Sequence, residues 1–326
     1  MTKIEEQIIT ALANGEWHST AGLAQSLVVD AQTLAQALHG LARFGLRLDA
    51  GLGASHRLNG GLELYNSYLI YKELLEHARK HITQLEIHWE TDSTNERLLA
   101  QSVTENIHGH ARLAEFQTAG RGRHGHPWTA SFGCGLCLSL GWRFQQGMAA
   151  DNSLSLAVAL ALTRALRRFG AEDVTLKWPN DVLWQDRKLA GILVERRWRA
   201  DRVCDTVIGL GLNLKFPVHF TQALEAGWAD LRHVLGRAVS RNAVAAAVLN
   251  ELCAVLSEYA HAGFAPFVDE WRRHDGLRGR AVTVQTSAGS IGGTAAGISE
   301  EGAFLVDVGE ERREFYSADV SVRIRA

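Results

Sequence analysis

No segment restricts the possible folds of this chain more than residues 189–194. Both alternating residue sets are apolar, with Leu189 and Leu193 in one and Ala190, Ile192 and Val194 in the other. This pattern is typical of a strand buried on both faces of a sheet. Lys188 opens the strand, and a buried ammonium costs several kcal/mol unless an anion pairs with it. That anion is either a nearby carboxylate, at Asp181, Asp186 or Glu195, or the carboxylate or phosphate of a ligand.

The residues around this strand, 63–276, alternate helical and strand patterns. Apolar residues at helical spacing predict long helices over 153–169 and over 242–259. Strand-like runs lie between them at 174–176, 182–184, 189–194 and 203–214. Strands mixed with two long helices predict an α+β domain built on a mixed sheet.

The first 62 residues predict three short helices and a hairpin. Apolar spacing places one helix before residue 14 and a second over 20–27. A third begins after Asp30, a favourable N-cap, and a hairpin covers 46–58. This arrangement is typical of a winged helix-turn-helix domain, although a three-helix interaction module without a DNA role has the same pattern.

The last part of the chain, 277–326, contains five short strand-like runs separated by Gly-rich or charged turns. A segment of this pattern suits a small SH3-like barrel. With 326 residues, the chain is long enough for two or three domains at roughly 150 residues each. The predicted organisation is therefore a winged helix-turn-helix domain at 1–62, a mixed-sheet domain at 63–276 and a barrel at 277–326.

The composition of the chain limits the cellular compartment in which the protein works and the classes of partner that it binds. The longest apolar run, 154–162, is shorter than the roughly 18–20 residues of a membrane span, and the acidic start lacks a signal-peptide pattern. Four cysteines in so long a chain are no disulfide framework. We therefore expect a soluble, cytoplasmic protein that does not enter a membrane. The net charge of −2 does not by itself indicate a nucleic-acid partner.

A glycine-rich basic loop follows the strand-like run 112–116. Its sequence is Gln-Thr-Ala-Gly-Arg-Gly-Arg-His-Gly at 117–125. Glycines let backbone N–H groups approach a ligand closely, and Arg121 and Arg123 offer planar donor groups suited to phosphate or carboxylate. Taken alone, the loop is more simply explained as a mobile basic surface segment.

A second polar segment is Lys-Trp-Pro-Asn-Asp at 177–181. A hairpin turn explains Pro179, Asn180 and Asp181 but leaves Lys177 unexplained. Asp181 is a candidate Mg²⁺ ligand for a bound triphosphate, because Mg²⁺ prefers carboxylate oxygen. Only 6 of the 34 basic residues are lysine, so the pair of Lys177 and Lys188 suggests a site that requires a compact point charge.

A helix N-terminus is predicted at 91–96. Ser93 and Glu96 have the spacing of a capping box. Capping explains Ser93 but leaves Thr94 and Asn95 as short polar groups that can hydrogen-bond a small polar ligand.

The histidines and cysteines at 124–137 admit a second interpretation, as a zinc site. Its ligands would be His124, His126, Cys134 and Cys137. Both cysteines, however, lie within a run, 132–140, that is typical of a buried strand, where cysteine acts as a small apolar residue. We therefore expect no structural metal.

Together and in this order, these segments resemble the motifs of the biotin protein ligases. The matching motifs are Gly-Arg-Gly-Arg-His-Gly at 120–125, Lys-Trp-Pro-Asn-Asp at 177–181 and Lys-Leu-Ala-Gly-Ile-Leu-Val-Glu at 188–195. The resemblance spans nearly the whole chain and includes the bacterial two-function form, which also represses biotin synthesis. It implies activation of biotin by ATP, with Mg²⁺, to biotinoyl-5′-AMP with release of pyrophosphate. Biotin then passes to a lysine of the biotin carboxyl carrier protein of acetyl-CoA carboxylase.

The resemblance also implies roles for individual residues. Biotin-binding residues would be Ser93, Thr94, Asn95, Gln117, Arg121, Gly122, Arg123 and Lys188, with Arg121, Gly122 and Arg123 on a loop that closes over biotin and the adenylate phosphate. Catalytic residues would be Lys188, which pairs with the biotin carboxylate, Lys177, which neutralises the α-phosphate, and Arg123. ATP or the adenylate would contact Trp128, Asn180, Asp181 and Asn213.

The N-terminal residues contain few of the cations that DNA binding requires. Residues 1–64 carry four basic and six acidic side chains, whereas phosphate contacts need a local excess of basic ones. The candidate DNA contacts are Gln32, Thr33 and Gln36 for bases and Arg43 for phosphate. Operator binding and repression are therefore weakly supported, and a homodimer would strengthen the half-site contacts.

Two other functions stay open from the residues alone. One is a transcriptional sensor that binds biotin or its adenylate without ligase activity. The other is a lipoate-type ligase. The cluster of Lys177, Lys188, Arg121 and Arg123 favours the enzyme, because a sensor of a neutral ligand does not need four cations.

Overall fold

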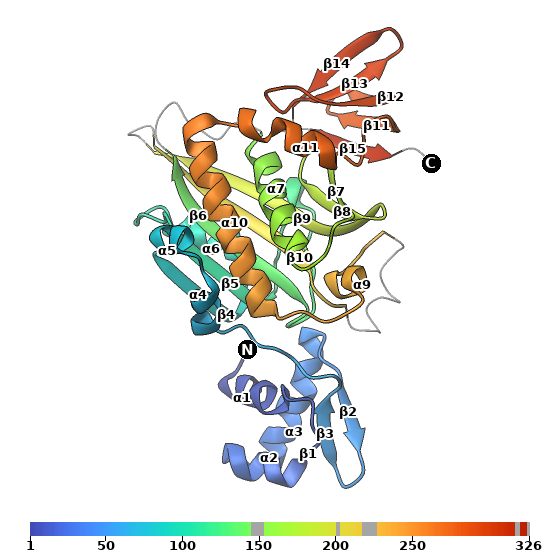
Figure 1. The fold of residues 1–326 in the computed structure, drawn as a ribbon. Coiled ribbons are helices and arrows are strands. Elements are labelled where there is room, and N and C mark those ends of the chain that lie inside the picture. Colours follow the sequence, from blue (N-terminus) through green and yellow to red (C-terminus); the bar gives the residue numbers. More distant parts are fainter. Residues whose placement is uncertain (145–152, 200–202, 217–226, 317–319, 325–326) are drawn as a thin grey trace.

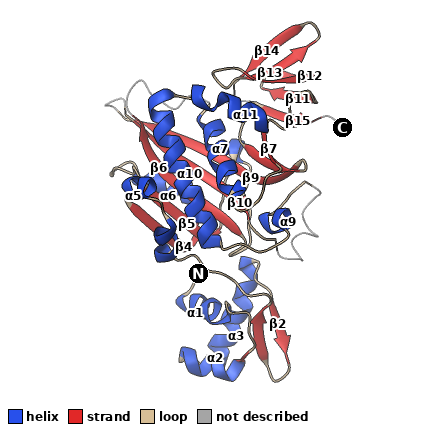
Figure 2. Ribbon diagram, in the orientation of Figure 1, coloured by secondary structure: helices blue, strands red, loops and turns tan. Residues whose placement is uncertain are grey.

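The computed structural model describes residues 1–144, 153–199, 203–216, 227–316 and 320–324. Three sheets follow one another along the chain, and the first and last lie at opposite ends of a central layer of strands and helices (Figure 1). Figure 2 shows that the N-terminal part is mainly helical and that the C-terminal part consists of strands. The predicted α+β class with a central mixed sheet is confirmed.

Three helices and a small sheet form the N-terminal part. The helices are α1 (Lys3–Leu12), α2 (Thr20–Leu27) and α3 (Ala31–Gly40), followed by the 3₁₀ helix η1 (Leu41–Phe44). Side-chain oxygens of Thr2, Ser19 and Asp30 accept backbone N–H groups in the first turns of α1, α2 and α3. The antiparallel sheet has the order β1 (His18–Ser19), β3 (Ser55–Leu58), β2 (Leu48–Gly51). The helices and the hairpin predicted for 1–62 are therefore present.

A seven-stranded mixed sheet forms the centre, in the order β4-β5-β6-β10-β9-β8-β7. Its strands are β4 (Gln84–Thr91), β5 (His110–Gln117), β6 (Gly135–Phe144), β7 (Val174–Lys177), β8 (Asp181–Trp184), β9 (Arg187–Trp198) and β10 (Cys204–Asn213). β4 and β5 run parallel, and the other neighbouring pairs are antiparallel. The four strands predicted between the long helices thus lie side by side in one sheet.

Two long helices, α7 (Leu154–Arg167) and α10 (Arg241–Ala262), cover one face of this sheet (Figure 1). Both match helices that the apolar spacing predicts. α10 is longer than the run at 154–162, and among the described residues it is the one helix long and apolar enough to cross a membrane. Since 67% of its most apolar window is buried inside the protein, these side chains belong to the core. Two short helices, α4 (Ser67–Glu73) and α5 (Glu76–His81), pack against α10.

Strand β9 is less completely buried than its sequence predicts. Leu189, Ala190 and Ile192 are buried, but Leu193 and Val194 are only partly so. Leu193 lines a cavity on the sheet, which accounts for an apolar side chain that is only partly covered.

An antiparallel five-stranded sheet with the order β14-β13-β12-β11-β15 follows helix α11 (Val268–His274). Its strands are β11 (Ala281–Thr286), β12 (Gly289–Ile298), β13 (Phe304–Val308), β14 (Glu311–Phe315) and β15 (Ser321–Ile324). Trp178, in the β7–β8 turn, stacks on Phe304 with ring centroids 5.2 Å apart, and its indole N–H donates to the Gly302 carbonyl at 3.1 Å. The C-terminal sheet is therefore fastened to the turn that contains residues 177–181.

Aromatic residues join the N-terminal part to the central sheet. Phe44, the last residue of η1, meets the edges of Phe116 and Phe132 at centroid distances of 5.3 and 6.2 Å. The Phe132 N–H donates to the Phe44 carbonyl at 2.9 Å. Since Phe116 lies in β5 and Phe132 follows the glycine-rich loop, the N-terminal part contacts the chain on both sides of that loop.

A buried ion pair stabilises the linker between the N-terminal part and the central sheet. The side chains of Arg241 and Glu115 are 7% and 3% exposed, and Arg241 Nη1 lies 2.7 Å from Glu115 Oε2. Glu115 also accepts the Tyr65 N–H at 2.6 Å. Arg241 lies over the Tyr65 ring, 3.8 Å from its centroid. The start of α10 thus fixes the linker that follows the N-terminal part.

Candidate active site

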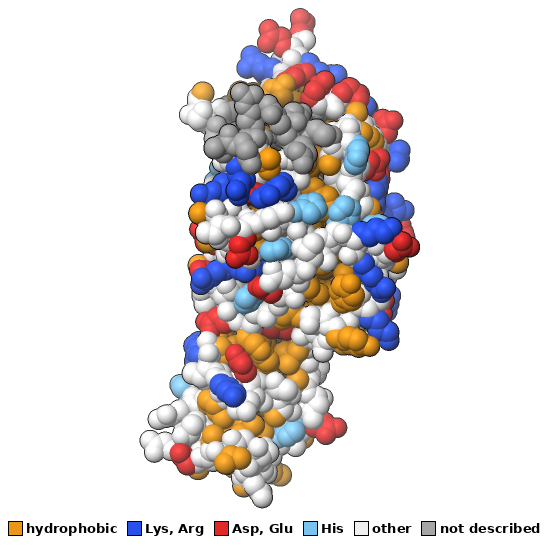
Figure 3. All heavy atoms as spheres, turned by 90° about the vertical axis from the view of Figure 1, so that its left-hand side faces the viewer, with side chains coloured by type: hydrophobic (Ala, Val, Ile, Leu, Met, Phe, Trp, Pro, Cys, Tyr) orange, Lys and Arg blue, Asp and Glu red, His pale blue; other side chains and the backbone are white. Residues whose placement is uncertain are grey.

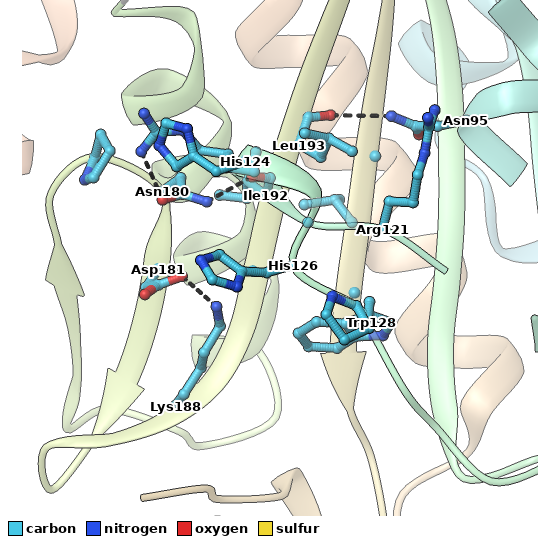
Figure 4. A pocket seen from close by; sticks show the side chains of 18 of the residues that line it. Asn95, Arg121, His124, His126, Trp128, Asn180, Asp181, Lys188, Ile192 and Leu193 are labelled. Atoms are coloured by element: carbon cyan, nitrogen blue, oxygen red, sulfur yellow. Dashed lines mark hydrogen bonds and ion pairs between the residues drawn. The ribbon is translucent and has the colours of Figure 1, made fainter. Parts of the chain in front are cut away.

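A cavity of about 450 Å³ lies between strands β9 and β10 and the loop 120–128 (Figure 4). The β7–β8 turn and the start of β15 complete its wall. Most of the predicted ligand-binding residues line it, namely Ser93, Thr94, Asn95, Gln117, Arg121, Gly122, Arg123, Trp128, Lys177, Asn180, Asp181 and Lys188. The fold therefore brings the four predicted segments to one site.

The N-terminus of helix α6 (Thr94–Gln101) supplies a polar wall. Thr94 donates its N–H and its hydroxyl to Gln117 Oε1, at 2.8 and 3.1 Å. Asn95 Nδ2 donates to Glu195 Oε2 at 2.9 Å and to the Leu193 carbonyl at 3.3 Å. Protein partners thus orient these side chains before any ligand arrives.

The predicted capping box is only half formed. Ser93 Oγ accepts the Glu96 N–H at 3.4 Å, but the Ser93 N–H donates to Asp92 rather than to Glu96. The Glu96 carboxylate pairs with Arg121 instead, and Arg121 also lies 3.3 Å from Glu195. The loop arginine is therefore tied to both α6 and β9.

Ser139, which the sequence analysis did not select, belongs to the same polar wall. Its side chain is completely buried in β6, where Oγ lies 2.7 Å from Thr94 Oγ1 and 2.5 Å from Asn95 Oδ1. The signal was available in the sequence, because Ser139 is a single hydroxyl within an otherwise apolar strand. A buried polar group in such a strand needs a partner.

The backbone of the loop 120–128 folds back on itself. The Gly122 N–H donates to the His126 carbonyl at 2.7 Å, and the Trp128 N–H donates to the Gly120 carbonyl at 2.8 Å. A Cβ atom on Gly120 would lie 2.4 Å from the Trp128 carbonyl oxygen, so this closure requires glycine there. The glycines of the motif therefore have a structural reason within the loop itself.

Arg123 extends from this loop to the opposite wall. Its Nη1 lies 3.4 Å from Asn180 Oδ1, and its Nη2 lies 3.5 Å from the Val320 carbonyl oxygen. Asn180 is held in turn, because its Nδ2 donates to the Ile192 carbonyl at 2.8 Å. The loop therefore contacts both the β7–β8 turn and the C-terminal part of the chain.

The partner of Lys188 is Asp181. Lys188 Nζ lies 2.7 Å from Asp181 Oδ1, and Lys177 Nζ lies 3.7 Å from Asp181 Oδ2. The other two carboxylates considered from the sequence are engaged elsewhere, Asp186 with Arg280 and Glu195 with Arg121. Two ammonium groups thus share one carboxylate at the cavity, which leaves an excess of positive charge for an anionic ligand.

This arrangement opposes the Mg²⁺ role considered for Asp181. Both of its oxygens face an ammonium group, and a divalent cation at this carboxylate would meet like charge. Among the described residues, no group of three or more His, Cys, Asp or Glu side chains is arranged to hold a metal ion. The magnesium of an ATP complex is therefore better placed on the phosphates than on Asp181.

Of Trp128 and Asn213, two of the predicted adenylate contacts, only Trp128 lines the cavity. The Trp128 ring lies over β10, where a Cβ atom on Gly211 would fall 2.3 Å from it. Asn213 is 1% exposed and does not line the cavity. Its Nδ2 donates to the carbonyls of Ala229 and Lys188, at 3.1 and 3.4 Å. Asn213 therefore lies outside the cavity wall, where its contacts fix the backbone at Lys188, and its contact with the adenylate stays a prediction.

The two cysteines beside the loop lie in protein rather than in an open metal site. Cys137 is buried in β6, and burial raises the pKa of its thiol to about 11. Burial likewise raises the pKa of the Cys134 thiol to about 11. Both groups therefore stay protonated near neutral pH, whereas a zinc ligand is a thiolate.

The candidate DNA contacts lie in α3 and η1, away from the cavity. Gln32 and Gln36 are exposed. Thr33 donates its hydroxyl to Asp30 at 2.9 Å. Arg43 makes two hydrogen bonds to Glu5, at 2.6 and 2.7 Å. Arg43 is therefore already paired with a buried carboxylate, and its contact with a DNA phosphate stays a prediction.

Comparisons with known proteins identify the family that this chain resembles. The Biotin/lipoate A/B protein ligase family model matches residues 90–213, which include the α6 wall, the loop and both lysines. The model of the biotin protein ligase C terminal domain matches residues 278–323.

Similar proteins cover almost the whole chain. The bifunctional ligase/repressor BirA of Escherichia coli (strain K12) is 33% identical over 317 residues, which are 97% of this chain and 96% of that protein. A biotin–acetyl-CoA-carboxylase ligase of Mycobacterium tuberculosis is 35% identical over 235 residues, covering 69% of this chain and 84% of that protein. The solved structure of a biotin protein ligase from Aquifex aeolicus, in complex with biotin and ATP, superposes with a TM-score of 0.63 at 28% identity. It covers 74% of this chain and 100% of the solved one.

Proposed function

Because the chain belongs to the biotin protein ligase family, we propose that its cavity activates biotin with ATP and then transfers the biotin to a carrier lysine. In the first step a biotin carboxylate oxygen attacks the α-phosphorus of ATP, and the bond from that phosphorus to pyrophosphate breaks. The product is biotinoyl-5′-AMP. In the second step the lysine amine takes the biotinoyl group and AMP leaves. The acceptor is the biotin carboxyl carrier protein of acetyl-CoA carboxylase.

The pairing of Lys188 and Lys177 with a single carboxylate carries this proposal. The first step brings two anions, a carboxylate and a triphosphate, into contact. Fixed cations lower the barrier because they hold both anions in place without reorganisation during the reaction. Lys188 pairs with the biotin carboxylate, and Lys177 faces the α-phosphate. Asp181 keeps both ammonium groups in the site before substrate binds.

The polar wall recognises the biotin head group. Ser93, Thr94, Asn95 and Gln117 present hydroxyl and amide groups to it, with Ser139 behind them as a positioning residue. A buried site whose polar groups match a ligand rejects acids that leave those groups unpaired. This favours biotin over lipoate, whose dithiolane ring has no hydrogen-bonding groups.

The loop 120–128 covers the adenylate. Its attachments through Arg121 and Arg123 to α6, β9 and the β7–β8 turn exclude water from a reactive anhydride. Trp128 and Asn180 lie where they reach the adenylate. The carrier lysine enters from the exposed side of this loop.

Pyrophosphate release in the absence of any carrier tests the first step. With ATP and Mg²⁺ we expect release with biotin and none with lipoate. Release with lipoate alone would make the chain a lipoate-type ligase. If neither acid supports release, while biotin still binds, the chain is a sensor rather than a ligase.

We also propose that the N-terminal part is a winged helix-turn-helix domain, with α2 and α3 as the helix pair and β2–β3 as the wing, and that the C-terminal sheet is an SH3-like barrel. Relatives named bifunctional ligase/repressor support a DNA-binding role. Two of the basic side chains are paired internally, Arg43 with Glu5 and Arg57 with Asp49. On the face shown in Figure 3, basic and acidic side chains are interspersed, and the N-terminal part displays few basic ones.

We propose that the protein is cytoplasmic. Its DNA-binding role can be tested directly. Binding of a biotin-operon promoter fragment is measured against salt concentration, with and without biotin and ATP. We expect binding as a homodimer with a shallow salt dependence, because few phosphates are neutralised. No binding at low salt, with the adenylate present, would contradict the repressor role and leave the ligase role intact.

A further inference from the structure

The second step needs a group that takes a proton. A carrier lysine is almost entirely ammonium near neutral pH, since its pKa in solution is roughly 10.4. An ammonium nitrogen has no lone pair with which to attack the acyl carbon of biotinoyl-AMP. A base at the mouth of the cavity therefore speeds the transfer, provided that it lies near that carbon.

Most side chains of the cavity wall cannot serve as this base. Lys177, Lys188, Arg121 and Arg123 are cations, and the hydroxyl, amide and indole groups of the wall are too weakly basic. Asp181 is the one carboxylate on the wall, and both of its oxygens face ammonium groups. Glu96 and Glu195, just behind the wall, pair with Arg121. Among the described wall residues, this leaves the imidazoles of His124 and His126.

His126 is the imidazole beside the reacting group. In Figure 4 its ring points towards Lys188 and Asp181, whereas His124 lies towards Asn180. Lys188 marks the position of the biotin carboxylate and hence of the acyl carbon. The His126 backbone is fixed, because its carbonyl accepts the Gly122 N–H at 2.7 Å and its N–H donates to the Arg123 carbonyl at 3.1 Å. The residue is exposed, so an amine on another protein can reach it.

We propose that His126 is the catalytic base of the transfer step, an inference that rests on the ligase function proposed above. The neutral imidazole takes one proton from the lysine ammonium. The freed amine nitrogen forms the bond to the acyl carbon, the bond from that carbon to the phosphate oxygen breaks, and AMP leaves with the electron pair. The second proton of the amine passes to solvent. His126 then returns its own proton to water.

His126 shares the cavity wall with several charged or titratable side chains. Arg121, Arg123 and His124 come from its own loop, and Lys177, Lys188 and Asp181 come from the strands opposite. Imidazole is the side chain that ordinarily changes charge between pH 5 and 8.

A single-turnover experiment on the full chain tests the proposal. The protein is loaded with biotin and ATP, freed of excess substrate and mixed with a biotin carboxyl carrier protein between pH 5.5 and 8.5. We expect His126→Gln to slow transfer at pH 7 by roughly 10- to 100-fold, near the lower end for a lost base, and to remove the part of the pH profile where imidazole titrates. The control His261→Gln changes an exposed histidine outside the cavity wall and should keep the parent profile.

Hydroxylamine separates a base from a merely structural role. Its nitrogen is already neutral near pH 7 and needs no base, so it should discharge loaded His126→Gln at the parent rate. Equal transfer by His126→Gln and the parent would overturn the proposal. So would a parallel loss of hydroxylamine discharge or of pyrophosphate release, since that pattern indicates loop damage or a phosphate contact. Absence of pyrophosphate release in the parent would instead overturn the ligase function beneath it.

Discussion

Replacement of Gly209 by alanine tests whether Asn95 sets the affinity for biotin. Gly209 lies in β10 on the cavity wall, and a Cβ atom there would fall 2.3 Å from Asn95 Oδ1 and 2.8 Å from Asn95 Cγ and Nδ2. Ordinary contacts begin near 3.4 Å, so the amide must move by about 1 Å. The Asn95 side chain is not free to do so, because Glu195, Leu193 and Ser139 all hold it.

Two magnitudes follow from this displacement. Overpacking of this kind costs about 1–3 kcal/mol of unfolding free energy, which is similar to losing two of the three hydrogen bonds at about 0.5–1.5 kcal/mol each. Misplacement of a binding group by about 1 Å costs up to roughly 100-fold in the step that depends on it. We therefore expect the Kd for biotin of Gly209→Ala to rise by about 10- to 100-fold.

The assay pairs biotin titration with urea unfolding. Gly141→Ala is the matched control, because its Cβ atom would fall 2.2 Å from the Ile107 carbonyl oxygen, outside the cavity wall. Gly141→Ala should lose stability and keep the parent Kd. If Gly209→Ala loses stability but binds biotin as the parent does, the amide of Asn95 does not contact biotin and the reasoning fails.

Three further perturbations have expected outcomes. Arg241→Met leaves the Glu115 carboxylate buried without its cation, so the unfolding free energy measured in urea should fall by about 3–5 kcal/mol. The double variant Arg241→Met, Glu115→Gln should recover much of that loss. A loss below about 1 kcal/mol in Arg241→Met would contradict the role of this pair. Lys188→Met should reduce pyrophosphate release with biotin at least 100-fold. The variant should fold normally, since the Lys188 side chain is 30% exposed and Asp181 keeps Lys177 as an ion-pair partner. Release within tenfold of the parent would show that Lys188 takes no part in the chemistry. Burial, followed by repulsion from neighbouring cations, lowers the pKa of His108 below its ordinary value, so the unfolded chain binds the proton more readily and stability should fall as the pH drops below about 6.5. His108→Leu should flatten the melting temperature between pH 7.5 and 5.5, and an unchanged slope would show that other groups dominate.

The elements of the fold were largely predictable because each depends on local patterns. Helices over 20–27 and 242–259, and the strand at 189–194, follow from apolar spacing within a few turns of chain. The order of strands in the sheet was not predictable in this way. β10 lies between β6 and β9, and a chain of alternating apolar residues does not specify which neighbours its backbone groups will bond.

The candidate site was likewise predictable in part, from local motifs, and unpredictable where it depends on packing. The motifs at 120–125, 177–181 and 188–195 identify the cationic wall because each is a short local pattern that contains lysine or arginine. Which carboxylate pairs with Lys188 depends on the hairpin register, which sets Asp181 opposite Gly191. Ser139, in the middle of β6, and Asn213, at the end of β10, are both buried polar residues. Only the packed structure shows that Ser139 supports the cavity wall and that Asn213 supports the backbone.

The contact of Phe44 with Phe116 and Phe132 has a consequence for shortening the chain. A fragment that begins after residue 62 would expose both rings, and Trp89, which stacks on Phe132 at 5.9 Å, to water. An uncovered aromatic surface of this kind promotes self-association. A version of this protein without the N-terminal part would therefore need polar replacements at these positions to stay monodisperse, even if its cavity were intact.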